Sequence, residues 1–202
     1  RDLTSNGPFN RLLLSWFVNS LANGIPSVLF ILFMKHVIGA NEITQGLFTL
    51  LYFLAGIVGM PLWIWLSRRH SKHRIWCVAM VLASAAFATV PALEAGDILL
   101  FGIIVLLTGF CLGADLALPP AMQADVAEYE YFRKGRDRTG IMFAAWSMST
   151  KLALAASVGI ALPMLDWLGT PEQGSIEKYD SMTLALIYAG LPVVLKVSVT
   201  LL

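Results

Sequence analysis

Six long apolar segments, separated by short polar or charged loops, follow one another along the 202-residue chain. Each is about 20 residues or longer, which is enough for a helix to cross a hydrocarbon core of about 30 Å. Backbone N–H and C=O groups in lipid must pair within the segment, so these segments are expected to be helices. The pattern predicts an all-α polytopic membrane protein with spans at about residues 9–37, 43–67, 75–93, 98–120, 139–165 and 181–202.

The composition supports this interpretation and argues against several other classes. Hydrophobic residues make up 57% of the chain and charged residues only 13%, whereas a soluble domain is about 45–50% apolar. We expect no enzyme, because the sequence has no Ser/His/Asp set and no phosphate-binding loop. Cys77 and Cys111 lie in separate apolar segments, so they predict core positions rather than a disulfide or a metal site. We also expect no cofactor and no nucleic-acid partner.

Charge is unevenly distributed between the loops, although the net charge is only +1. Lysine and arginine gather before the first span and after the second and fourth spans, while the alternate loops are mainly acidic. Cytoplasmic loops of membrane proteins carry the excess of Lys and Arg. Both ends of the chain are therefore predicted to face the cytoplasm.

The first span carries a polar stripe inside an apolar helix. Ser15, Asn19, Asn23 and Ser27 recur every four residues, which places them near one side of a helix. A Gly/Pro break lies beside the last two. The stripe either lines a cavity, as broken helices do in transporters, or hydrogen-bonds neighbouring helices together.

Lys151 lies within the otherwise uncharged run from residue 139 to residue 165. At a rise of 1.5 Å per residue it is about 18–20 Å from either end, so its side chain cannot reach a membrane face. A charge at this depth is costly and usually faces a partner or a watery cavity. We expect Lys151 to face the interior of a larger assembly with Ser147 and Leu154 on its side of the helix, the alternative being a purely structural lysine. Trp146, one turn earlier, is either a packing residue or substrate-facing.

The fourth span combines a buried acid, close-packing glycines and a double proline. Pro119 and Pro120 predict that the span ends or kinks there. Asp115 then lies about one turn inside the cytoplasmic edge, with either a cavity role or a hydrogen bond to a neighbouring helix. Gly109 and Gly113 form a small-xxx-small pattern, which predicts close helix packing.

Helix count, orientation and the positions of the polar residues suggest the three-plus-three inverted repeat of one half of a major facilitator. No residue-by-residue repeat is evident. The stretch ADVAEYEYFRKGRDRTGIMFAAWSMSTK, residues 124–151, resembles the tenth-to-eleventh helix region of the glycoside-pentoside-hexuronide:cation symporters. PLWIWLSRRHSKHR, residues 61–74, is similar to that family's loop between helices eight and nine. The resemblance implies that residues 1–202 form helices seven to twelve, the C-terminal half, with the N-terminal half absent from this sequence.

The resemblance also implies roles for residues around the fifth span. Lys151 matches the family's eleventh-helix lysine, which lies near acidic residues of the other half that bind the coupling cation, Na⁺ or H⁺. Trp146, Ser147 and Thr150 fall beside it at positions that border the sugar cavity. With Asn19, Asn23 and Asp115, they complete the predicted substrate-binding and coupling set.

On the cytoplasmic side, the resemblance implies a gate made of charged residues. Asp125 and Glu128 match acidic residues that close this side together with Arg136 or Arg138. There are also departures from the family pattern, since the fourth span has no aromatic platform for a sugar ring, Leu116 following Asp115.

The function that the resemblance implies is cation-coupled symport of a sugar or glycoside by alternating access, in the cytoplasmic membrane of a bacterium. The expected partners are the N-terminal half, the lipid bilayer and a small-molecule substrate. The alternatives are a carrier of lysolipids or other small solutes from the same superfamily, and a membrane sensor that does not transport.

Overall fold

The computed structural model describes residues 7–135, 137–168 and 181–201, and the regular structure in these ranges is helical. Within them, six helical units are long and apolar enough to cross a membrane, which confirms the predicted fold class. The helices are α1 (Gly7–Phe33) continued by the π-turn η1 (Met34–Ile38), α2 (Glu42–Arg69), α3 (Lys72–Ala88) with the short η2 (Val90–Ala92), α4 (Ile98–Lys134), α5 (Thr139–Leu168), and α6 (Ser181–Ala185) continued by the π-turn η3 (Leu186–Gly190) and α7 (Leu191–Thr200).

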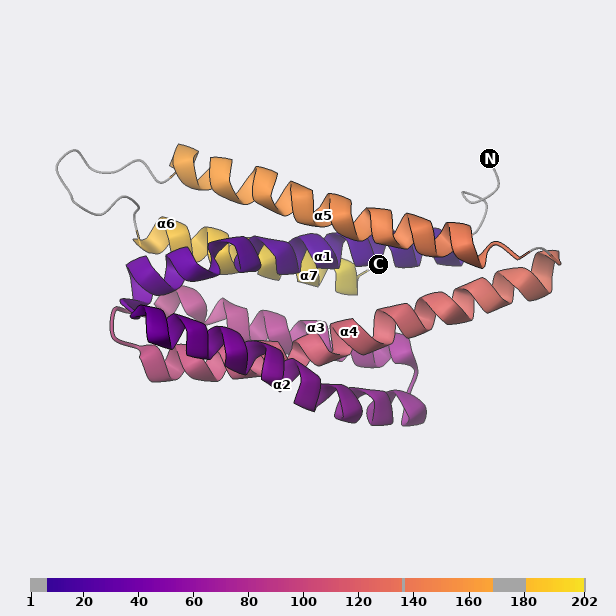
Figure 1. The fold of residues 1–202 in the computed structure, drawn as a ribbon, viewed down its shortest axis with the longest axis horizontal. Helices are drawn as coiled ribbons and strands as arrows, with labels where there is room; N and C mark the ends of the chain where they lie inside the picture. Colours follow the sequence, from indigo (N-terminus) through magenta and orange to yellow (C-terminus); the bar gives the residue numbers. More distant parts are fainter. Residues whose placement is uncertain (1–6, 136, 169–180, 202) are drawn as a thin grey trace.

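The fourth helix is longer than predicted, because α4 continues through the double proline to Lys134. The prolines remove two backbone donors but do not end the helix, since the following residues, AMQADVAEYEYFRK, are rich in good helix formers. In Figure 1 the second part of α4 runs obliquely to its first part. A kink, the second of the two predicted outcomes, is therefore what α4 shows, and the helix itself does not end at residue 120.

Helix packing follows an internal symmetry that the sequence does not display. α2 packs against α4 and α1 against α5, while α3 packs on α4 and α7 packs on α1. Exchanging the first three helices for the last three in order (α1 with α4, α2 with α5, α3 with α7) converts each of these contacts into another of them. This is the pattern expected of a three-plus-three repeat. In Figure 1, α1, α2, α4 and α5 form the nearer layer, and α3 and α7 lie behind it.

The contact between α2 and α4 depends on glycine. A Cβ atom on Gly113 would lie 2.5 Å from the carbonyl oxygen of Gly56, and one on Gly109 would collide with the backbone of Tyr52. The predicted close packing at Gly109 and Gly113 is therefore confirmed.

The core is aromatic at the end of the bundle that holds η1, η2 and η3. The rings of Phe33 and Tyr188 stack at 4.4 Å, and Phe101 lies 5.3 Å from Phe33 between ring centroids. A second buried cluster contains Trp63 and Trp76. These clusters fix α1, α3, α4 and α7 around the polar residues described below.

Two helices bury little of their surface in this chain. Only 22% of the most apolar stretch is buried in α2 and in α5, against 44–50% in the other four spans. Large apolar side chains such as Phe53, Ile57, Met148 and Leu152 are exposed on them. Lipid or further protein must cover these faces.

Candidate functional site

A pair of opposite charges lies inside the bundle, on α4 and α7. Asp115 is 5% exposed and Lys196 is 3% exposed, and Lys196 Nζ lies 3.7 Å from Asp115 Oδ2. Buried charges in a membrane protein require a partner. Each member of this pair supplies the partner of the other.

Three more polar side chains complete this group, which we call the buried charge cluster: Asn19, Asn23, Trp76, Asp115 and Lys196. Lys196 donates from Nζ to Asn19 Oδ1 at 2.9 Å. Asn23 Nδ2 donates to Asp115 Oδ2 at 2.7 Å, and Trp76 Nε1 donates to Asp115 Oδ1 at 2.6 Å. The cluster thus joins α1, α3, α4 and α7, so both asparagines of the polar stripe and Asp115 bond neighbouring helices.

Sequence reasoning missed Lys196 and Trp76. Lys196 is the one charged residue in the apolar run from residue 181 to residue 202, but it lies only six residues from residue 202, whereas Lys151 lies far from both ends of its run. Trp76 lies near the start of the third predicted span, where amphipathic rings favour the membrane interface, but it is 2% exposed and bonded to Asp115. No sequence pattern distinguishes an indole that lies at the membrane interface from one that donates a hydrogen bond to a buried carboxylate.

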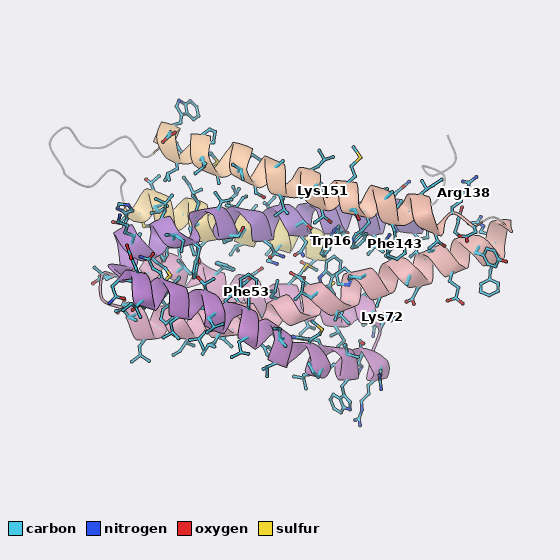
Figure 2. All side chains as sticks on the ribbon, in the orientation of Figure 1. Trp16, Phe53, Lys72, Arg138, Phe143 and Lys151 are labelled. Carbon is cyan, nitrogen blue, oxygen red and sulfur yellow. The ribbon has the colours of Figure 1, made fainter. Side chains whose placement is uncertain are left out.

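Lys151 is exposed on α5 in this chain, as is Ser147 one turn earlier. Figure 2 labels Lys151 near the middle of the helix. Leu154, on the same side, is 50% exposed, and no polar contact to Lys151 is found among the described residues. Among the residues whose burial the structure describes, the buried lysine is Lys196. Lys151 instead lies among exposed apolar side chains on the surface of α5.

Trp146 and Thr150 belong to the packing between α5 and α1. The rings of Trp16 and Trp146 stack at 4.7 Å with 14° between their planes. Trp16 Nε1 donates to Thr150 Oγ1 at 2.7 Å. Of the three residues predicted to border the cavity beside Lys151, which are Trp146, Ser147 and Thr150, only Ser147 is exposed as Lys151 is.

The charged residues predicted as a cytoplasmic gate are spread along the end of α4 and the start of α5. Asp125 pairs with Lys72 at the start of α3, at 2.7 Å. Glu128 is exposed, and Arg138 directly precedes α5. Arg136 lies outside the described residues.

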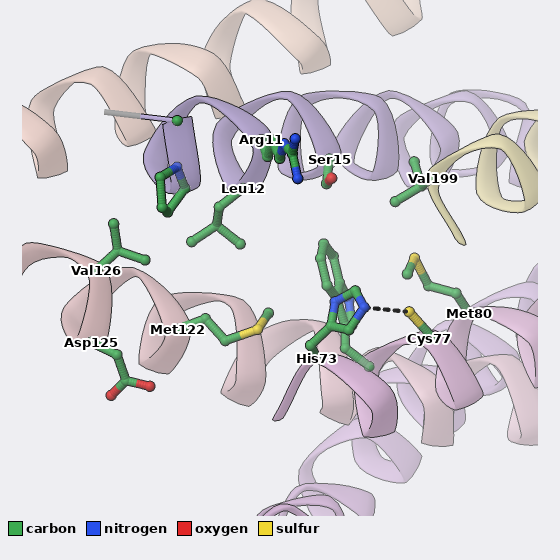
Figure 3. Close-up of a pocket in the computed structure, with 13 residues that line it drawn as sticks. Arg11, Leu12, Ser15, His73, Cys77, Met80, Met122, Asp125, Val126 and Val199 are labelled. Atoms are coloured by element: carbon green, nitrogen blue, oxygen red, sulfur yellow. Dashed lines mark hydrogen bonds between the residues drawn. The ribbon is translucent and has the colours of Figure 1, made fainter. Parts of the chain in front are cut away.

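Two cavities larger than a water molecule border the buried charge cluster. A cavity of about 740 Å³ (Figure 3) lies between the first turns of α1 and α3 and the part of α4 that follows the double proline, and its lining includes Arg11, Ser15 and Trp76. A second cavity of about 160 Å³ lies towards the other end, between α1, α2 and α4, and its lining includes Asn23 and Ser27. The polar stripe of α1 therefore fits both alternatives that the sequence left open. Its middle residues, Asn19 and Asn23, hydrogen-bond to neighbouring helices, and its outer residues, Ser15 and Ser27, line cavities.

Comparison with known proteins identifies the family. The whole chain, residues 1–202, matches the family described as MFS/sugar transport protein. The sodium-dependent lysophosphatidylcholine symporter 1-A of Danio rerio is 26% identical over 197 residues, 96% of this chain and 36% of the relative. The human sodium-dependent lysophosphatidylcholine symporter 1 is 26% identical over 198 residues, with the same coverage. The sphingosine-1-phosphate transporter MFSD2B of Xenopus tropicalis is 24% identical over 199 residues, 95% of this chain and 37% of the relative.

The chain spans little more than a third of the length of these relatives. It holds six membrane-length helical units within the described residues, packed as a half of a major facilitator fold. These relatives are named for the transport of lysolipids, so they do not confirm the narrower resemblance to melibiose-carrier-like symporters. On the match of the full chain, the protein belongs to the MFS/sugar transport protein family of the major facilitator superfamily.

Proposed function

We propose that this chain is the C-terminal half of a sodium-coupled carrier of a lysolipid. The observation that carries this proposal is the similarity, over 95–96% of the chain, to two symporters of lysophosphatidylcholine and a transporter of sphingosine 1-phosphate. The proposal replaces a sugar with a lysolipid as the favoured substrate and keeps the cation-coupled, alternating-access mechanism.

The surface around Lys151 has the chemistry that such a substrate needs. Lysophosphatidylcholine and sphingosine 1-phosphate each combine one phosphate group with a single long hydrocarbon chain. Lys151 is a lone cation on α5, and Met148, Leu152 and Leu154 around it are at least half exposed. A phosphate that reaches the ammonium would therefore leave its hydrocarbon chain against apolar side chains.

Lys151 also supplies a route to coupling. In the substrate-free carrier, we propose that its ammonium pairs with carboxylates of the N-terminal half. A sodium ion that binds those carboxylates weakens their attraction for the ammonium, which then becomes available to the phosphate. The two halves then rock about the central site, with the charged cytoplasmic ends pairing and parting.

A sugar substrate remains the second candidate, because the family description includes sugar transport. An aromatic platform for a sugar ring needs an open ring face. Trp146 is only 8% exposed and one of its faces is covered by Trp16. The aromatic residue nearest Lys151 in sequence is therefore not available as a platform in this conformation.

Uptake by the full-length carrier in proteoliposomes tests the proposal. Radiolabelled lysophosphatidylcholine, sphingosine 1-phosphate and melibiose are offered with an inward sodium gradient, and with choline in place of sodium. We expect sodium-dependent accumulation of a lysolipid and none of melibiose. Accumulation of melibiose alone would show that the protein is a sugar symporter. The absence of uptake of every solute would favour a non-transporting sensor.

A further inference from the structure

The buried charge cluster has the composition of a cation site. Asn19 is fully buried, and Asp115 and Lys196 are at most 5% exposed. Carboxylate and amide oxygens are the ligands that hard cations take in proteins. Here the cation among them is the ammonium group of a lysine, 2.9 Å from Asn19 Oδ1 and 3.7 Å from Asp115 Oδ2.

Polar groups around the ammonium are incompletely satisfied within the described structure. Asn19 Nδ2 is buried and has no hydrogen-bond partner. A cavity of about 10 Å³ borders Asn23, Asp115 and Lys196, which is about the space of one water molecule. An ammonium has three donors; among the described residues this one donates a hydrogen bond to Asn19, and the Asp115 carboxylate lies 3.7 Å away as an ion-pair partner. The site therefore has room and polar groups for an additional small ligand.

We propose that Asp115 and Asn19 form a monovalent-cation site of this half, and that Lys196 occupies it as a tethered cation. A lysine ammonium is a compact, strongly hydrated point charge on a flexible chain, so it can stand where a sodium ion would otherwise bind. The cluster is then neutral without any ion from solution. Coupling ions of the carrier bind elsewhere, and this site contributes none of them. This last consequence rests on the proposed sodium-coupled transport, whereas the site itself does not.

The surroundings would allow a free ion to reach the site once the tether is removed. The 10 Å³ cavity and the 160 Å³ cavity share four lining residues: Asn23, Tyr52, Phe87 and Thr108. The two cavities adjoin, and truncating the lysine side chain would enlarge the smaller one. Sodium should then replace the ammonium between Asp115 and Asn19.

Thermal unfolding of the full-length carrier in detergent tests the site without any transport assay. The midpoint is measured in sodium chloride and in choline chloride of equal concentration, for the parent, Lys196→Ala and Lys196→Ala/Asp115→Asn. We expect Lys196→Ala to unfold well below the parent in choline. Sodium should raise its midpoint by at least about 2 °C more than it raises that of the parent, because a ligand that binds only the folded state stabilises it. The additional response should saturate with sodium and disappear in the double variant.

Matched variants keep the test decisive. Lys35→Ala removes an exposed lysine and should respond to sodium as the parent does. Lys196→Gln, whose amide donates to Asp115 without a charge, is the second variant if Lys196→Ala is poorly expressed. A sodium response equal to the parent's in both position-196 variants would overturn the proposal. So would their absence from the membrane at every salt composition, since sodium would then fail to replace the ammonium.

A transport readout separates this inference from the proposed function. If the carrier takes up lysolipid, the rate should depend more steeply on sodium in Lys196→Ala than in the parent, because an additional ion must bind. An unchanged dependence would contradict the tethered-cation role even if lysolipid uptake is confirmed. An additional stabilisation by sodium, in a carrier that takes up no lysolipid, would refute the proposed function alone.

Discussion

Asp115 and Lys196 stabilise the bundle only as a pair, because each would be an isolated charge without the other. Removing one partner of a buried pair costs about 3–5 kcal/mol, whereas replacing both by uncharged residues is often neutral. We therefore expect Asp115→Ala to lower the thermal unfolding midpoint of the full-length carrier strongly. Asp115→Asn/Lys196→Met should recover most of the loss. A double variant as unstable as Asp115→Ala would show that the two charges are not coupled.

At the start of α5, Asp137 stabilises the first helical turn. Its Oδ1 accepts a hydrogen bond from the backbone N–H of Thr139 at 3.0 Å, and this bond lowers the pKa of the carboxyl below its usual value. A carboxyl with a depressed pKa in the folded state stabilises above its unfolded pKa, and the effect is lost as the pH falls through the folded pKa. Asp137→Ala should therefore weaken amide protection in this turn at neutral pH, measured by hydrogen exchange. A difference between parent and variant that persists at pH 2 would contradict this account.

Single residues could be singled out where one physical rule bears on their environment. A charge far from both span ends must have a function or a partner, and this rule selected Lys151 but not Lys196, which lies only six residues from residue 202. What the rule cannot supply is the direction of the side chain. Both lysines lie within apolar helices, yet Lys151 points out of this chain and Lys196 into it, because that depends on which neighbour each helix packs against.

At the scale of helices, the sequence predicted the number of spans because length and apolar content alone decide whether a segment crosses a membrane. It did not predict the length of α4, because prolines were given more weight than the helix-forming residues that follow them. The sequence also did not predict which helices pack together, because the inverted repeat is present in the contacts between helices and not in residue identities.

Gly113 offers a direct test of the contact between α2 and α4. In Gly113→Ala the new Cβ would lie 2.5 Å from the Gly56 carbonyl oxygen, so the helices must separate. Such overpacking costs about 1–3 kcal/mol, and we expect a lower unfolding midpoint in detergent. Gly46→Ala is the matched control on α2, because nothing lies within 4 Å of its new Cβ. It should be neutral or stabilising, since alanine favours helix over glycine. Equal midpoints for the two variants would refute close packing at Gly113.

At the scale of the whole molecule, we propose that the exposed apolar faces of α2 and α5 pack in part against the other half of the carrier. The family match confirms the fold that helix count and charge distribution suggested. The substrate could not be predicted from the sequence alone, because a cation on an apolar helix face is compatible with both a sugar symporter and a lysolipid carrier.

The orientation of the bundle follows from its basic loops and has a simple test. We expect the α2–α3 loop to face the cytoplasm and the α3–α4 loop the opposite side. In a full-length carrier from which every native cysteine has been removed, including Cys77 and Cys111, single cysteines at Ser71 and Ala95 should react with a membrane-impermeant maleimide from opposite sides. Reaction of both from the same side would show that the predicted topology is wrong.

The most direct test of the account is the coupling role of Lys151, measured as sodium-driven uptake of lysophosphatidylcholine by the full-length carrier. Lys151→Ala should abolish accumulation against a gradient while the protein remains in the membrane at nearly parental abundance, because an exposed side chain of this chain contributes little to its folding. Lys35→Ala, which removes an exposed lysine in η1, should transport as the parent does. If Lys151→Ala accumulates lysophosphatidylcholine at the parental rate, Lys151 is not the coupling residue and the proposed mechanism is wrong.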